Sequence, residues 1–300
     1  MRRTLTAALA SVVLSLAFAT GALAQAGAAT AQSALLQGAR AYREGKFAEA
    51  ERHFRRALEL DPSRSNTRVF IARSIQQQYR ANDASPENAA VADRALVAYQ
   101  EILDAGRTNE ALYEDAYKAI IFINGQLKRD DKVAETLTLR ANDSFVSNEN
   151  RADAFVILAS RKWQCSYDIT ESKDSQSSEG TRSASSPKYK MPSDAGDFIK
   201  ARGCVDEGLQ LIEQAASLAP ESESVWKYKA QLLREASKLA EMEGNAELKE
   251  DYDRQYEESL DGQKRTGGRE AQRKSDSERQ GSRSTTAPAA PPEPPAPNFD

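Results

Sequence analysis

The stretch SALLQGARAYREGKFAEAERHFRRALELDP, residues 33–62, decides the fold. Its apolar and small residues recur three and four positions apart in two runs, which is the pattern of two amphipathic helices. Gly45 lies between the runs, where a helix commonly ends in a left-handed backbone. Asp61-Pro62 ends the second run, because proline disfavours helical geometry in the residue before it. The stretch therefore predicts a helix–turn–helix unit.

The spacing of the second run recurs far along the chain. Two sets of four residues share it: Ala50, Phe54, Ala57 and Pro62, then Gly208, Ile212, Ala215 and Pro220. Trp226 and Ala230 follow the second set with the first-helix pattern of a further unit. Self-similarity of this kind is the signature of a repeat architecture.

These units resemble the tetratricopeptide repeat, a helix–turn–helix module of about 34 residues. Gly38 matches the small residue at which the two helices of that module approach closely, and both sets of four match its second helix. The resemblance implies an all-α fold, a right-handed α-solenoid of about five degenerate repeats over residues 31–260. Weaker matches place first helices around residues 71–75, 112–119 and 155–159, and a second helix at about 132–141.

The N-terminus has the features of a secretory signal peptide. Arg2 and Arg3 precede an uncharged apolar run, and Ala22-Leu23-Ala24 is a small-x-small cleavage site. An uncleaved anchor is the alternative, but the apolar core is shorter than the roughly 20 residues that span a bilayer. We expect residues 1–24 to be removed, residues 25–30 to be a flexible start, and the protein to be exported to the periplasm or secreted.

Two other segments lack the apolar residues that a packed core needs. An excursion at residues 166–193 is rich in Ser, Lys and Glu, and interrupts the fourth repeat. Residues 261–300 are predicted to be a disordered tail, basic at first and then rich in Pro and Ala. Before that tail, the highly charged residues 246–260 suit a helix that caps the repeat stack.

Cys165 and Cys204 are the only cysteines. In the repeat register, Cys165 falls at the end of the fourth unit's first helix and Cys204 near the start of its second, so the two face each other. An oxidising compartment then favours a disulfide. Two free thiols or a redox-active pair are the alternatives, and two cysteines are too few for a metal site.

No catalytic motif is present in the sequence. It contains no Gly-rich phosphate loop, no Gly-x-Ser-x-Gly elbow and no His-Glu-x-x-His run, and His53 is the only histidine. We therefore expect no enzyme activity, no cofactor and no metal. The formal net charge of −4 also argues against a general nucleic-acid binder.

The resemblance places the binding surface on the concave groove that the first helices line. Leu35 and Ala39 occupy the positions where some family members grip a carboxylate terminus with Lys and Asn, so that mode is not supported. Tyr42 and Trp163 have the alternative of packing against neighbouring helices. The residues expected to line the groove are Leu35, Tyr42, Arg43, Arg73, Gln76, Gln77, Trp163 and Arg234.

These features together predict a non-enzymatic scaffold or adaptor in the bacterial cell envelope. It would bind segments of other envelope proteins in the groove of the solenoid. One alternative is an envelope tether that acts through the Pro-rich tail, with the repeats structural. A secreted enzyme or small-molecule binder is less favoured.

Overall fold

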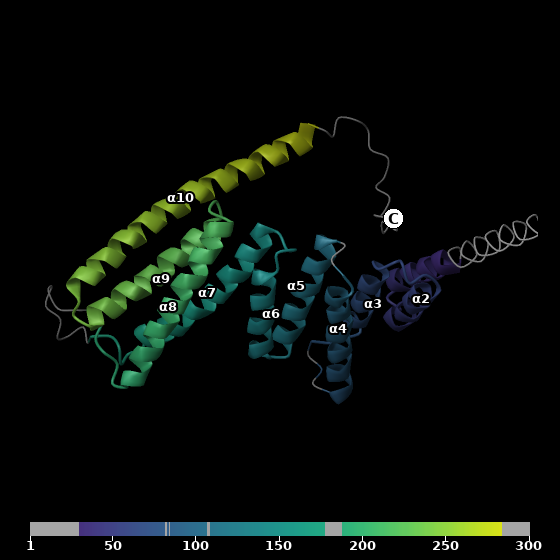
Figure 1. Cartoon of the computed structure of the whole chain (residues 1–300), viewed down its shortest axis with the longest axis horizontal. Helices are drawn as coiled ribbons and strands as arrows, with labels where there is room; N and C mark the ends of the chain where they lie inside the picture. Colours follow the sequence, from purple (N-terminus) through teal and green to yellow (C-terminus); the bar gives the residue numbers. More distant parts are fainter. Residues whose placement is uncertain (1–29, 82, 84, 107–108, 178–187, 284–300) are drawn as a thin grey trace, which may run out of the picture. The chain divides into compact units, whose positions relative to one another are not determined.

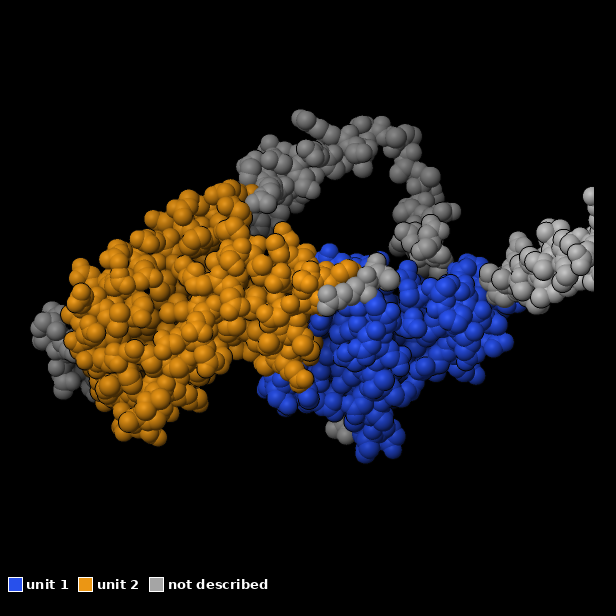
Figure 2. Space-filling view, viewed as in Figure 1, with its two compact units in different colours: residues 1–133, 297–300 blue, residues 134–296 orange. Residues whose placement is uncertain are grey.

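The computed structural model describes residues 30–81, 83, 85–106, 109–177 and 188–283, with side chains as far as residue 269. The predicted signal peptide and residues 284–300, which include the Pro-rich run, lie outside this part. The described residues divide into two compact units (Figure 2): unit 1 ends at Val133, and unit 2 begins at Ala134. Each unit is considered by itself.

The described residues are helical throughout, apart from turns and one isolated β-bridge between Gln176 and Tyr189 (Figure 1). The all-α solenoid of helix-turn-helix repeats is therefore confirmed. A first helix covers residues 30–43. It is followed by α2 (Phe47–Leu60), α3 (Thr67–Gln76), α4 (Pro86–Asp104), α5 (Glu110–Gln126), α6 (Asp130–Asn142), α7 (Asn148–Thr170), α8 (Ala195–Leu218), α9 (Glu223–Met242) and α10 (Ala246–Arg283).

The first helix pair of unit 1 forms as the opening stretch predicts. Gly45 has a φ of 73°, the left-handed value that turns the chain between the two helices. A Cβ added to Gly38 would lie 2.7 Å from two carbons of the Phe54 ring, so the glycine permits the close helix approach. Ala50, Phe54 and Ala57 are buried, and α2 ends at Leu60, just before Asp61-Pro62.

The intermediate helices follow the predicted register. In unit 1 the apolar stripes of α3 and α4 are buried through Ile75 and Tyr99. In unit 2, α7 buries Phe155 and Ala159, while α8 buries Ile212 and Ala215. Pro220 follows the end of α8 and is exposed, as Pro62 is after α2. A Cβ on Gly208 would lie 2.5 Å from Leu232 Cδ2, which repeats in unit 2 the close approach seen at Gly38.

The predicted disulfide is present, since Cys165 and Cys204 are joined with their Cα atoms 6.2 Å apart. It links α7 to α8. The repeat register implied that Cys204 lies near the start of its helix. This detail is wrong, because α8 already begins at Ala195. The pair therefore joins two long helices within their bodies.

The boundary predicted for the C-terminal tail is wrong. Residues 261–283 continue α10 instead of starting a disordered segment at Asp261. The helix runs alongside α9 (Figure 1), and beyond the predicted end Arg269 forms an ion pair with Glu221, which lies in the turn before α9. Ala230 on α9 is buried, as predicted for the repeat core, whereas Trp226 is half-buried and its ring packs on Gly262 of α10.

The excursion at residues 166–193 also packs more than its composition predicted. Residues 166–170 belong to α7, and Ser175 and Tyr189 are buried. The Tyr189 backbone N–H donates to Glu241 of α9 at 3.0 Å, and Ser193 donates to Asp174. Polar contacts hold both ends of the excursion, whereas residues 178–187 lie outside the described part. None of the described helices is long and apolar enough to cross a bilayer.

Candidate partner-binding site

The predicted groove residues are divided between the two units, and one of them is misassigned. Leu35 is only 1% exposed and belongs to the core of unit 1, where it packs among residues such as Phe54 and Ile75. A leucine at this position serves the contact between helices, so it is not available to a partner. The remaining residues are at least partly exposed.

The polar groups of the other unit 1 residues are largely engaged within the unit. Arg73 forms an ion pair with Asp115 at 2.5 Å, and Gln76 accepts a hydrogen bond from the Tyr99 hydroxyl. Burial raises the pKa of Tyr99, so the hydroxyl keeps its proton and remains a donor. These contacts connect α3 to α4 and α5, and they stabilise the repeats.

Tyr42 and Arg43, on the first helix, also contact neighbouring groups within unit 1. Tyr42 packs edge-on against Phe47 with ring centroids 5.3 Å apart. Packing against a neighbouring helix is the alternative to partner binding for this residue. Arg43 Nε donates to the carbonyl of Ala39 at 3.4 Å. Neither side chain lines the polar hollow described next.

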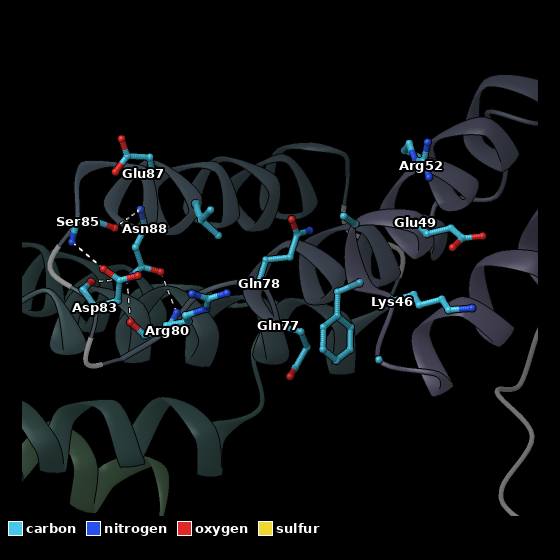
Figure 3. A pocket seen from close by; sticks show the side chains of 14 residues that line it. Lys46, Glu49, Arg52, Gln77, Gln78, Arg80, Asp83, Ser85, Glu87 and Asn88 are labelled. Atoms are coloured by element: carbon cyan, nitrogen blue, oxygen red, sulfur yellow. Dashed lines mark hydrogen bonds between the residues drawn. The ribbon is translucent and has the colours of Figure 1, made fainter.

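Unit 1 has a polar hollow of about 750 Å³ that includes Gln77 and no other predicted groove residue. Figure 3 shows its wall from the start of α2, with Lys46 and Arg52, facing the loop that joins α3 to α4. Asn88 fixes that loop, because its amide donates to the carbonyls of Arg80 and Asp83.

The charges around this hollow are mixed. Its lining contains Lys46, Arg52 and Arg80 as well as Glu49, Asp83 and Glu87. The Ser85 hydroxyl and backbone N–H beside Asp83 hold the pKa of that carboxyl below its usual value, so it stays ionised. Carboxylates and cations of equal number give the hollow no preferred sign of ligand charge.

A second hollow, of about 390 Å³, lies in unit 2 between α7, α9 and α10, and here two predicted groove residues meet. Trp163 comes from α7 and Arg234 from α9. We call it the aromatic hollow. Its lining consists of Trp163, Tyr167, Lys227, Ala230, Gln231, Arg234, Glu235, Lys238, Tyr256, Leu260 and Gln263.

Aromatic rings form the walls of the aromatic hollow. The Trp163 ring centroid lies 5.1 Å from that of Tyr167 and 6.2 Å from that of Tyr228, which is the next aromatic residue along α9 after Trp226. The Arg234 guanidinium lies over the Tyr256 ring of α10, 5.6 Å from its centroid. Tyr167 is 39% exposed, so apolar ring surface remains open to solvent.

A buried charge network forms the floor. Lys238 Nζ donates to Glu235 and to Glu171 at 2.6 Å each, and Glu235 also accepts from the Thr170 hydroxyl at 2.6 Å. Burial raises the pKa of Glu171, but the hydrogen bond and positive charge of Lys238, together with the Tyr189 hydroxyl and the Lys188 charge, outweigh burial and lower the pKa of this carboxyl. The charge of Lys238 is therefore balanced by Glu235 and Glu171. The positive charge that the rim presents to solvent comes from Lys227 and Arg234.

One polar atom of the lining has no partner. Gln231 Oε1 is buried, and it accepts no hydrogen bond within the described ranges. A buried acceptor without a donor carries a desolvation cost of about 1–3 kcal/mol.

Several residues of the aromatic hollow were missed by the sequence reasoning, although part of the signal was available. Lys227, Gln231 and Lys238 lie three or four positions from one another or from Arg234, so they share one face of α9 with it. Tyr167 lies one turn beyond Trp163 on α7. Tyr256 could not be placed, because it comes from the helix that was assigned to a polar cap.

The comparisons with known proteins agree with the predicted repeat. A family model described as tetratricopeptide repeat matches residues 31–64, which confirms the resemblance for the first helix pair. No curated protein matches the chain.

Three solved structures resemble the chain at low identity. A tetratricopeptide-repeat protein from Bacteroides fragilis NCTC 9343 is 18% identical, with a TM-score of 0.47 over 67% of this chain and 81% of that one. The MamA protein is 13% identical, with a TM-score of 0.38 over 80% and 94%. The complex of the TPR2AB domain of yeast Sti1 with pHSP90 is 12% identical, with a TM-score of 0.33 over 77% and 99%.

Proposed function

We propose that the chain is a non-enzymatic scaffold or adaptor of the bacterial cell envelope, which binds a segment of a partner protein in the aromatic hollow of unit 2. Tetratricopeptide repeats generally mediate protein–protein interactions, and proteins that carry them are typically not enzymes. The partner is expected to be another envelope protein.

The observation that carries this proposal is the meeting of Trp163, Tyr167 and Arg234 in one open recess. Tryptophan, tyrosine and arginine are the residues that most often dominate the binding energy of protein interfaces. The guanidinium of Arg234 is held over the Tyr256 ring, so part of the entropy of ordering it is already lost before a partner binds. The polar hollow of unit 1 contains only one predicted groove residue, Gln77.

The location rests on two observations. The basic start, apolar run and cleavage site of residues 1–24 are those of an export signal. The disulfide between Cys165 and Cys204 suits an oxidising compartment, where such bonds persist. Cell fractionation with N-terminal sequencing tests the location: the periplasmic form should begin at Gln25, and a form retaining Met1 in the cytoplasm would contradict it.

Site-specific photo-crosslinking tests the binding site. A crosslinking residue at Lys227, on the rim of the hollow, should trap a defined partner in living cells. The matched control is a crosslinker at Ile199 of α8, which is 70% exposed and does not line the hollow.

The adduct should disappear when Trp163→Ala is introduced, because removing an interface anchor typically costs 2 kcal/mol or more, about 30-fold in affinity. Circular dichroism should show that the variant stays folded. The proposal fails if both positions trap the same proteins, or if the Lys227 adduct persists in Trp163→Ala.

A further inference from the structure

The aromatic hollow has the surface chemistry that proline-rich segments bind. Trp163 and Tyr167 of α7 and Tyr256 of α10 present rings from two helices around one recess. Extended polyproline helices dock on such aromatic grooves, because their conformation is already formed and little entropy is lost. Prolines offer carbonyl acceptors, and the Trp163 indole N–H makes no hydrogen bond within the described part of the chain, so it is available as a donor.

The rim charges select for acidic segments. Lys227 and Arg234 are exposed, and Arg234 forms no ion pair with any described residue. Residues 284–300 contain two acids, Glu293 and Asp300, and no basic residue. The sequence PPEPPAPNFD, residues 291–300, thus combines prolines with charge opposite to that of the rim. We call it the acidic proline segment.

The acidic proline segment is also within reach. Gln263 of α10 lines the hollow, and α10 continues to Arg283. The helix rises about 1.5 Å per residue, so its end lies about 30 Å beyond Gln263. Residues 284–300 span about 50 Å at the polyproline rise of 3.1 Å per residue, so a chain that turns back along α10 brings residues from about Pro294 onward to the hollow.

We infer that the aromatic hollow is the docking site of the chain's own acidic proline segment, which binds within the same molecule. This inference requires no partner protein, so it stands apart from the proposed function. Attachment to α10 gives the segment an effective concentration on the order of 1 mM, which compensates for a weak intrinsic affinity. A partner that uses the hollow would have to displace the segment.

Quenching of tryptophan fluorescence by acrylamide tests the inference on the purified full chain. The test variant replaces Pro291, Pro292, Pro294 and Pro295 with serine, outside every described contact. Trp163 and Trp226 are the only tryptophans, so the share of Trp163 is the difference between each protein and its Trp163→Phe form. We expect the quenching constant of Trp163 to rise about twofold when the segment no longer covers the ring.

Trp226 is the internal control, because it packs on Gly262 and its quenching should not change. A synthetic peptide of residues 287–300, added to the serine variant at about 1 mM, should restore the protection of Trp163, and Arg234→Gln should weaken that restoration. Equal Trp163 quenching in both proteins, with no effect of the peptide, would overturn the inference. Protection that is lost on dilution would assign the segment to a second copy and overturn the intramolecular docking.

Discussion

The indole ring of Trp226 lies directly against Gly262, where an added Cβ would come within 2.5 Å of two ring atoms. The ring is fixed from its other end, because Trp226 Nε1 donates to the carbonyl of Pro220 at 2.8 Å. Because Gly262 has no side chain, an aromatic ring of α9 can pack directly on the backbone of α10. Gly38 under Phe54 and Gly208 beside Leu232 are the same arrangement at two other helix contacts.

Replacing Gly262 with alanine should loosen α10 from α9. The added methyl meets a ring held in place, so we expect a loss of about 1–3 kcal/mol in the free energy of unfolding. Hydrogen exchange should increase along α10, and urea denaturation measures the stability. Gly268 on the same helix has nothing within 4 Å of an added Cβ, so Gly268→Ala should stabilise by about 0.5–1 kcal/mol. Equal behaviour of the two variants would contradict the contact.

The length of α10 shows where hydrophobic periodicity stops being informative. The sequence predicted the helix pairs correctly, because large apolar residues such as Phe54 and Ile212 mark their contacts. From Ser259 to the last described side chain, at residue 269, the buried positions of α10 are Ser259, Gly262 and Thr266, which are small or polar. A helix that docks through small residues under an aromatic ring carries no apolar stripe, so hydrophobic periodicity predicts a tail at this point of the chain.

The sequence predicted the excursion and the candidate site only in part, because the contacts that form them leave no periodic pattern. Glu241 accepts hydrogen bonds from the backbone of Lys188 and Tyr189, and no sequence period marks such a contact. The repeat register found Trp163 and Arg234 on first helices. It could not reveal Tyr256, because the position of α10 against α9 depends on Gly262.

Removing the disulfide should destabilise the protein. Cys165 and Cys204 are 39 residues apart in sequence, and a loop of this length gives about 3–4 kcal/mol in the loop-entropy model. The double variant Cys165→Ser/Cys204→Ser should therefore unfold at lower guanidinium concentration, and a reducing agent should lower the stability of the parent protein but not of the variant. Two titratable thiols in unfolded, unreduced protein would show that the bond does not form.

Replacing Lys238 with methionine should cost far more than replacing an exposed basic residue. The side chains of Lys238 and Glu235 are 6% and 1% exposed, so removing the cation leaves a buried carboxylate without its partner. A loss of about 3–5 kcal/mol is expected. The control is Arg40→Met, whose partner Glu44 is exposed, and which should cost far less.

A second substitution separates loss of the partner charge from loss of packing. In Lys238→Met/Glu235→Leu both charges of the pair are gone, so much of the stability should return. Urea denaturation of the two variants and the parent measures the difference. If Lys238→Met alone costs no more than Arg40→Met, the buried network does not stabilise unit 2.

The stability of unit 2 should fall in acid through Glu171. Burial raises the pKa of this carboxyl, but the hydrogen bond and charge of Lys238 and the hydrogen bond from Tyr189 together more than offset burial, so the folded pKa lies below the ordinary value of 4.5. A carboxyl of this kind stabilises the fold fully above pH 4.5, and the contribution disappears as the pH falls through the folded pKa. Glu171→Gln should therefore be less stable at neutral pH and lose less stability below pH 4.5.

Tyr189→Phe is the matched variant for this titration. It removes the hydroxyl that donates to Glu171 Oε1 at 3.0 Å and leaves the Lys238 contact in place. Its stability should decline in acid with a slope between those of the parent and Glu171→Gln. Glu51 and Asp253 have pKa values lowered in the same direction, so part of the acid dependence remains in every variant. Urea denaturation at a series of pH values measures the slopes, and a Glu171→Gln slope equal to that of the parent would show that Glu171 does not contribute.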